Sequence, residues 1–168
     1  MEEPLPLSMS EVLEKTNRLK AYHRVVQNGG SAGVDKMSTD SLGSYLSSHW
    51  TELSSLLSSG RYLPSPVRQV EIPKPKGGTR NLGIPTVLDR YIQQSFAQVL
   101  SAYYEPTFSD YSYGFRPNRS THDAVEQSLS YLNSGYEYVV VIDISNYFGT
   151  VNHDQLLYSL SKESEDKV

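Results

Sequence analysis

The first sixty residues carry hydrophobic positions at helical spacing. Between residues 38 and 59, apolar and aromatic side chains recur every three or four positions: Leu42, Tyr45, Leu46, His49, Trp50, Leu53, Leu56 and Leu57. The serines and Glu52 between them form a polar face, and Gly60 is well suited to end the helix. The pattern predicts one helix over residues 38–59, with a leucine stripe that packs in a core.

An earlier helix is predicted over residues 10–27. Ser8 and Glu11 have the spacing of a capping box, in which the serine caps the helix and the glutamate reaches back to it. Asn28-Gly29-Gly30 ends the helix, because glycine tolerates the left-handed conformation found at helix C-termini. Residues 29–37 are then expected to form a flexible, glycine-rich loop.

Two short strands are predicted over residues 67–72 and 80–84. The turn between them contains two prolines and two glycines, which favours a hairpin. Because side chains alternate along a strand, Arg68 should share a face with Val70 and Ile72. By the same rule, Arg80 should share a face with Leu82 and Ile84.

Two further helices are expected between residues 87 and 133. Thr86 can cap the first, which runs to about Tyr104, and Ser120 starts the second, which Gly135 closes. The intervening residues 107–119 form a loop rich in tyrosine, glycine, proline and arginine.

The last part of the chain predicts a strand and a short helix. Residues 139–142 are apolar at successive positions, which indicates a strand over residues 136–144 that is covered on both faces. Asn152 or Asp154 can cap a final helix over residues 155–160.

The composition is that of a folded domain. The chain has 168 residues, 38% hydrophobic and 20% charged, which is enough for a packed core. It contains no cysteine, which excludes disulfides and thiolate metal sites, and its four scattered histidines lack metal-ligand spacing. No apolar run could span a bilayer and no secretory leader opens the chain, so we expect a cytoplasmic protein without a membrane partner.

The charge is distributed unevenly although the net charge is only −4. Residues 61–119 hold eight basic and four acidic side chains, whereas residues 120–168 hold two basic and eight acidic ones. A basic middle between acidic flanks can hold a polyanion locally, and ordinary variation of charge along a chain is the alternative explanation.

Asp143 is the first candidate for chemistry. It follows the apolar run, and a carboxylate beside buried valines is costly unless a cation or metal compensates it. The alternative is an aspartate bonded to backbone N–H groups in a turn. Two-metal phosphoryl chemistry needs several carboxylates, and no second one is fixed beside Asp143 by local spacing.

The basic hairpin is the second candidate. Lys74, Lys76 and Arg80 surround a glycine-bearing turn, with Arg68 on the partner strand. Glycine lets the backbone approach a ligand, and arginine offers two-pronged contact to phosphate. Solvated surface charge is the alternative.

The loop over residues 111–120 is the third candidate. Aromatic side chains interleaved with Arg116 and Arg119 can stack on bases and hold phosphates. The alternative is an aromatic corner in which Arg116 binds backbone carbonyls.

These motifs, taken in order, resemble those of the group II intron-encoded reverse transcriptases, or maturases. The segments that carry the resemblance are residues 72–86 with Asp89-Arg90, residues 113–117 with Arg119-Ser120, Asp143-Ile144, Tyr147-Phe148, residues 151–154 and Gly33-Val34-Asp35. Retron and other bacterial reverse transcriptases share some of them.

The resemblance implies roles for individual residues. Arg68, Lys74 and Arg80 match positions that clasp the triphosphate of a deoxynucleotide. Asp143 matches the first catalytic aspartate, a ligand of both Mg²⁺ ions, with the Ile144 carbonyl assisting.

Further matches concern the sugar and the nucleic acid. Tyr147 matches the aromatic residue that packs under the sugar and rejects a 2′-hydroxyl. The loop with Gly33 matches a lid over the template strand, and the positions expected to contact nucleic acid are Gly33, Lys76, Arg116, Asn118 and Arg119.

The resemblance also implies an α+β fold: a helix-rich fingers subdomain with a β-hairpin, plus the first strand and helix of a palm. The expected organisation is a lead-in over residues 1–9, N-terminal extension helices and lid over 10–60, fingers over 61–135 and a truncated palm over 136–168. Gly149 departs from the acidic residue that the family often has there, and no Asp-Asp pair occurs in the chain. We therefore expect a fragment that does not polymerise alone.

The implied partners are intron RNA, an RNA template with a DNA primer, and a deoxynucleoside triphosphate. In the intact enzyme the cofactor is a pair of Mg²⁺ ions. Two alternatives stay open: a non-catalytic RNA-binding module, and a homodimer formed through an exposed apolar surface or strand edge.

Overall fold

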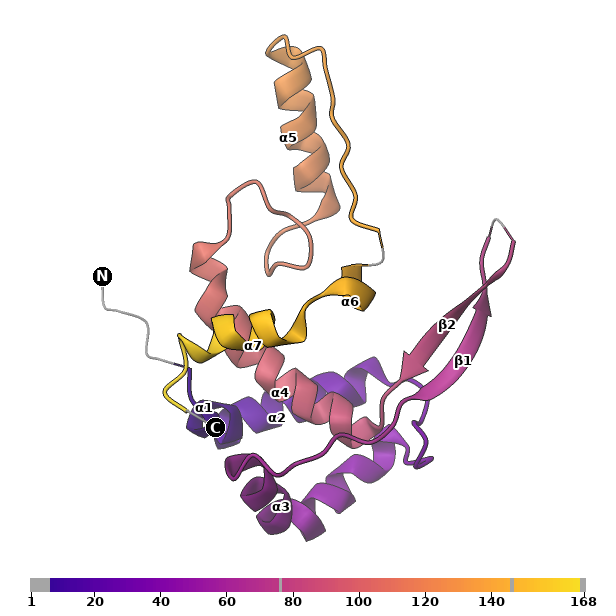
Figure 1. Ribbon diagram of the computed structural model, residues 1–168, viewed down its shortest axis with the longest axis vertical. Helices are drawn as coiled ribbons and strands as arrows, with labels where there is room; N and C mark the ends of the chain where they lie inside the picture. The colour runs from indigo at the N-terminus through magenta and orange to yellow at the C-terminus, as the bar shows by residue number, and fades with distance from the viewer. Residues whose placement is uncertain (1–6, 76, 146, 167–168) are drawn as a thin grey trace. The chain divides into compact units, whose positions relative to one another are not determined.

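The computed structural model describes residues 7–75, 77–145 and 147–166, and the chain divides into two compact units (Figure 1). The first unit comprises Met1–Ser101 and Glu163–Val168, and the second comprises Ala102–Lys162. The organisation predicted from the sequence, with boundaries near residues 60 and 135, stays a prediction.

The first unit begins with two helices where the sequence predicted one. α1 spans Met9–Leu13 and α2 spans Lys15–Asn28, and Glu14 between them has an extended backbone (φ −60°, ψ 139°). The carbonyls that the break releases are taken by side chains. The Asn17 amide donates to Val12 O (2.9 Å), and Arg18 Nε donates to Leu13 O (2.8 Å).

The predicted capping box at the start of α1 does not form. Ser8 is the N-cap residue, but its side chain makes no capping bond, and its hydroxyl instead lies 2.7 Å from that of Ser10. The neighbouring Leu7 pairs with Ser164 in an isolated parallel bridge, which brings residues 163–166 back to the start of the same unit.

α3 and α4 supply the rest of the helical core. A short 3₁₀ turn (Thr39–Ser41) leads into α3 (Leu42–Ser58), and α4 spans Val87–Tyr104. The core contains Ala21, Val25, Leu42, Leu53, Leu57, Val87, Tyr91 and Ile92. Of the predicted stripe, Leu42, Leu53 and Leu57 are confirmed as core and Leu46 and Trp50 pack against it, whereas His49 is exposed. Within the described parts of the chain, no helix is long and apolar enough to cross a membrane.

The predicted hairpin is confirmed to within a residue at each end. β1 (Arg68–Pro73) and β2 (Thr79–Ile84) pair antiparallel, with Arg68 opposite Ile84 and Ile72 opposite Arg80. Since directly paired residues point to the same face, Arg68 and Arg80 lie on one face of the ribbon.

Among its described residues, the second unit contains a short 3₁₀ turn (Glu105–Thr107) and three α-helices that follow it. α5 (Thr121–Asn133) begins with the predicted capping box, formed by Ser120 and Asp123. α6 (Tyr147–Thr150) is a single turn, and α7 (His153–Ser161) is capped by the Asn152 side chain, which accepts from Gln155 N at 2.9 Å.

The predicted strand over residues 136–144 is not formed. These residues have no regular backbone hydrogen bonding, and β1–β2 is the only sheet among the described residues. The side chains of residues 139–142 are 76–87% exposed rather than covered on both faces. A strand needs a neighbour to pair with, and the described part of the chain supplies none. The helix-rich α+β class with a hairpin is nevertheless confirmed.

Candidate nucleic-acid interface

The hairpin presents three exposed cations. Arg68 and Arg80 stand on the same face about 13 Å apart along the ladder, at an ordinary strand rise. Lys74 lies in the turn, and Lys76 lies outside the described residues. Among the described residues, none of these three cations forms an ion pair. Their charge is therefore available to an anionic ligand.

The turn of the hairpin is closed by its own backbone. Lys74 N donates to Gly78 O (2.9 Å), and Gly77 N donates to Lys74 O (3.0 Å). Gly77 and Gly78 both have positive φ (92° and 80°), a conformation that a side chain would disfavour. No atom lies within 4 Å of a Cβ built at either glycine, so the backbone of the turn is open to a ligand.

The glycine-rich loop is anchored rather than freely flexible. Gly33 is buried, and a Cβ there would lie 2.6 Å from Thr86 Cα, so only glycine fits. Arg90 of α4 donates to the carbonyls of Gly29 (3.2 Å) and Ser31 (3.0 Å). The next residues, Val34, Asp35 and Lys36, are exposed. Gly33 thus packs inward, and its contact with nucleic acid stays a prediction.

A buried carboxylate lies next to this anchor. Asp89, 3% exposed, accepts hydrogen bonds from the Tyr62 hydroxyl (2.8 Å), Ser65 N (3.2 Å) and the Thr86 hydroxyl (2.5 Å). Its own N–H donates to Thr86 Oγ1 (3.0 Å), so Thr86 caps α4 as predicted. Burial, followed by the bond to Asp89, raises the pKa of Tyr62 well above its usual value.

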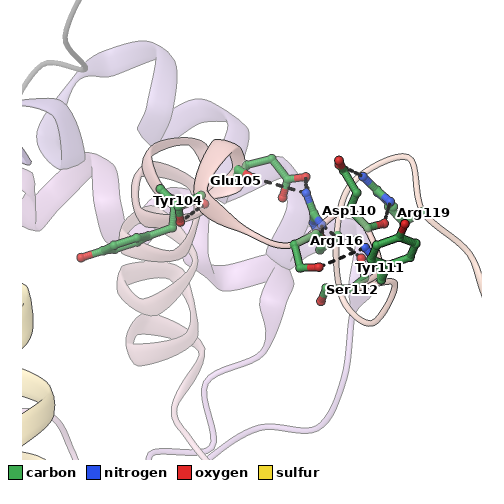
Figure 2. A network of polar contacts seen from close by, with 9 residues as sticks. Tyr104, Glu105, Asp110, Tyr111, Ser112, Arg116 and Arg119 are labelled. Carbon is green, nitrogen blue, oxygen red and sulfur yellow. Dashed lines mark hydrogen bonds and ion pairs between the residues drawn. The ribbon is translucent and has the colours of Figure 1, made fainter.

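In the second unit, Arg116 builds the loop over residues 105–120 (Figure 2). Its side chain is 7% exposed and uses all five of its N–H donors within the chain. Nε and Nη2 donate to Glu105 Oε1 (3.0 and 2.7 Å), and Nη2 also donates to Glu105 O (3.3 Å). Nη1 donates to the carbonyls of Ser109 (2.5 Å) and Ser112 (3.1 Å). These contacts favour the alternative that Arg116 folds the loop.

Asn118 and Arg119 are the other predicted contacts in this loop. Asn118 is exposed and has a positive φ of 58°. Arg119 donates to the carbonyl and carboxylate of Asp110, as Figure 2 shows, and its guanidinium lies 5.6 Å from the centre of the Tyr113 ring. The Arg119 side chain remains 26% exposed, so it is more accessible than Arg116.

The predicted catalytic residues also belong to the second unit. Asp143 and Ile144 lie in the irregular exposed segment, and Tyr147 begins α6. A carboxylate and a backbone carbonyl are oxygen ligands that suit Mg²⁺. However, the described residues contain no group of three His, Cys, Asp or Glu side chains that could hold a metal. Asp143 and Ile144 therefore do not make a two-metal site by themselves.

Sequence reasoning gave no role to Asp89, Arg90 or Glu105. The spacing of Thr86 and Asp89 is that of a helix cap. It predicts one of the four hydrogen bonds of Asp89, the one from Asp89 N to Thr86 Oγ1. Tyr62 and Ser65 lie more than twenty residues from Asp89, and Glu105 lies eleven residues from Arg116. No local pattern predicts such pairs.

The family described as "Reverse transcriptase (RNA-dependent DNA polymerase)" matches residues 72–167. Lys74, Arg80, Arg116, Asp143 and Tyr147 lie inside this range, and Arg68 lies just before it.

Individual proteins are similar over most of the chain. Protein YkfC of Escherichia coli is 36% identical over 138 residues, which are 80% of this chain and 36% of that protein. The Group II intron-encoded protein LtrA of Lactococcus lactis is 32% identical over 147 residues (87% and 24%). The Putative COX1/OXI3 intron 2 protein of Saccharomyces cerevisiae is 33% identical over 152 residues (89% and 17%). The chain thus spans 17–36% of the length of these relatives.

We predict that the difference in the free energy of unfolding between the wild type and Tyr62→Phe becomes smaller at alkaline pH. At neutral pH the variant should lose about 1 kcal/mol, because one hydrogen bond to Asp89 is removed. The unfolded tyrosine ionises near pH 10, whereas the folded Tyr62 has a raised pKa. Its contribution is therefore fully present below about pH 10 and is lost as the pH rises further. Urea unfolding followed by the fluorescence of Trp50, the single tryptophan, checks this; a gap that is constant from pH 7 to 11 would contradict it.

We also predict that Arg116→Lys loosens the loop over residues 105–120. An ammonium group cannot reach a carboxylate and three carbonyls at once, so local opening should become easier by about 2 kcal/mol. Hydrogen exchange of the loop amides measures this change. Arg119→Lys is the matched control, and its effect should stay below about 1 kcal/mol because its ion pair is exposed. Equal effects of the two variants would show that Arg116 does not organise the loop.

Proposed function

This chain belongs to the reverse transcriptase (RNA-dependent DNA polymerase) family, and we propose that it acts as the fingers part of an intron-encoded enzyme of that family. In this proposal the hairpin holds the phosphates of nucleic acid or of an incoming deoxynucleoside triphosphate. The observation that carries it is the exposure of Arg68, Lys74 and Arg80, which form no ion pair with any described residue, around an open glycine turn. Relatives with intron-encoded names support the subgroup.

The proposal assigns roles to the other residues as well. The exposed part of the loop after Gly33, together with Asn118 and Arg119, would contact the template strand. Tyr147 would lie under the nucleotide sugar. Asp143 and the Ile144 carbonyl would contribute oxygen ligands for Mg²⁺, which stabilises the attacking and leaving oxygens of phosphoryl transfer when it is bound at a complete site. We place no reaction step on these two ligands alone.

We also propose that residues 1–168 do not polymerise DNA by themselves. Two-metal chemistry needs several carboxylates, the sequence contains no Asp-Asp pair, and the described residues hold no cluster of three metal-binding side chains. Binding of intron RNA is then the activity expected of this chain on its own.

We predict that replacing Arg68, Lys74 and Arg80 together by alanine weakens binding to a structured intron RNA. The slope of log K against log salt should fall by about two to three, because each lost phosphate contact removes somewhat less than one unit. The measurement is the dissociation constant for intron RNA and for an unrelated RNA at two salt concentrations.

The matched control removes three exposed cations from α2, by changing Lys15, Lys20 and Arg24 to alanine. If this control weakens binding as much as the hairpin variant does, net charge rather than the hairpin holds the RNA. Equal affinity for both RNAs would indicate generic electrostatics.

A primer-extension assay on the wild type tests whether the chain polymerises or only binds RNA. Template-dependent extension would contradict a purely RNA-binding role.

A second candidate function, self-association, is favoured by the apolar segment over residues 139–142. Four consecutive β-branched side chains there are 76–87% exposed, and their backbone is unpaired among the described residues. Such a segment can pair with the same segment of a second copy.

We predict that the wild type forms dimers or larger assemblies as its concentration rises, and that Val139→Lys with Val141→Lys makes it monomeric. Lysine opposes edge pairing through its charge. Light scattering over a concentration series measures the mass, and Val125→Lys on α5, also exposed, is the control. A wild type that remains monomeric at every concentration would rule the idea out.

A further inference from the structure

The two chain segments that enter and leave the hairpin meet at one side chain. Ser65 precedes β1 by three residues, and Thr86 follows β2 by two. Beyond the last ladder pair, Arg68 with Ile84, no strand pairing continues. Ser65 N and the Thr86 hydroxyl nevertheless both donate to Oδ2 of Asp89, at 3.2 and 2.5 Å. The carboxylate therefore closes the base of the hairpin.

Asp89 is attached to a rigid support. It lies in the first turn of α4, where the helix dipole favours a negative charge. Its neighbour Arg90 is bonded to the carbonyls of Gly29 and Ser31, and Gly33 packs against the backbone of Pro85 and Thr86. The turn of helix that carries the carboxylate is thus also bonded to the loop over residues 29–33.

Asp89 has no cationic partner among the described residues. Among the described residues, no Lys, Arg or His forms an ion pair with Asp89, although its side chain is almost completely buried. Within the described parts of the chain, its negative charge is compensated by the Tyr62, Ser65 and Thr86 donors and by the helix N-terminus. A buried charge satisfied in this way fixes the position of each of its donors, because losing any one is costly.

We propose that Asp89 is a positioning residue that fixes the direction in which the β1–β2 hairpin leaves α4, and with it the placement of Arg68, Lys74 and Arg80. The inference rests on the proposed function only in that the positioned cations are those assigned to phosphate. Asp89 itself is buried at the base of the hairpin and touches no ligand.

The test measures the direction of the hairpin directly. The chain contains no cysteine, so Glu52→Cys on α3 and Glu71→Cys on β1 introduce two unique labelling sites, both exposed. Glu71 lies on the face opposite Arg68 and Arg80, so the label leaves the basic face free. Pulsed electron resonance between two spin labels gives the distribution of distances, and we expect a single narrow peak for the otherwise wild-type chain.

Asp89→Asn keeps the size of the side chain but replaces one accepting oxygen by an NH₂ group. If the NH₂ group replaces Oδ2, it faces the Ser65 N–H, which cannot accept; if it replaces Oδ1, the Tyr62 hydroxyl must reverse its role and accept, so a wild-type bond is lost or reversed in either orientation. We expect the narrow peak to be lost. Asp123→Asn is the matched control, because Asp123 occupies the same helix position in the capping box of α5 but is exposed and accepts from Ser120 N. We expect it to leave the peak unchanged.

Two results would overturn the inference: a folded Asp89→Asn variant with an unchanged narrow peak, or an equal broadening by Asp123→Asn. If Asp89→Asn does not fold, Thr86→Val and Thr86→Ser decide. Thr86→Val removes one donor to the carboxylate and should broaden the distance peak. Thr86→Ser keeps the hydroxyl and should leave the peak narrow. Equal peaks for the two variants would overturn the inference.

The distances are measured without nucleotide, so they test the positioning role separately from the proposed function. Titration of dTTP with Mg²⁺ into the wild type and Asp89→Asn tests the consequence. A dissociation constant raised about tenfold or more in the variant, with the wild type binding, supports both. A wild type that does not bind dTTP contradicts the proposed triphosphate role of the hairpin, while the distance distributions still decide on Asp89.

Discussion

A carboxylate removed from water must find hydrogen-bond donors close by, and in the first unit that requirement falls on Asp89. The donors come from two separate stretches of the chain: Tyr62 and Ser65 before the hairpin, and Thr86 after it. Satisfying one charge therefore joins the end of the α3 connection, both ends of the hairpin and the start of α4. The apolar core supplies cohesion, but it is the carboxylate that specifies how the hairpin is attached to that core.

In the second unit the buried charge is a cation, Arg116, which needs hydrogen-bond acceptors close by. The Arg116 guanidinium holds Glu105 and the carbonyls of Ser109 and Ser112, and so gives a fixed shape to the loop that follows the 3₁₀ turn Glu105–Thr107. An arginine whose five donors are all engaged is poorly placed to bind phosphate as well. In both units, the buried charge builds the frame, whereas the exposed charges, such as Arg68 and Arg80, remain available to a ligand.

The sequence predicted those features whose cause is local. The leucine stripe of α3, the glycine turn of the hairpin and the Ser120–Asp123 capping box each depend on residues a few positions apart, and all were predicted. The break at Glu14 was missed, because it is stabilised by Asn17 and Arg18 reaching back to carbonyls, which a hydrophobic pattern does not record. Of the candidate site, alternation along each strand was predicted, which placed Arg68 with Val70 and Ile72, and Arg80 with Leu82 and Ile84. That Arg68 and Arg80 share one face follows from the register of the pairing, which was not predicted. The bonds of Asp89 to Tyr62 and Ser65, and of Arg116 to Glu105, join residues 11 to 27 positions apart and could not be predicted from a local pattern.

The strand over residues 136–144 failed for a different reason. Its β-branched residues favour an extended backbone, but a strand is stable only when a neighbouring strand pairs with it. The same segment carries Asp143 within a unit whose residues 102–162 hold seven acidic and three basic side chains. A polyanion is repelled by such a unit unless cations intervene. The hairpin over residues 67–84 holds four basic side chains and one acidic one. Under the proposed function, affinity for nucleic acid is therefore expected to originate at the hairpin. Asp143, for which a catalytic role is proposed, would then depend on binding that other residues provide.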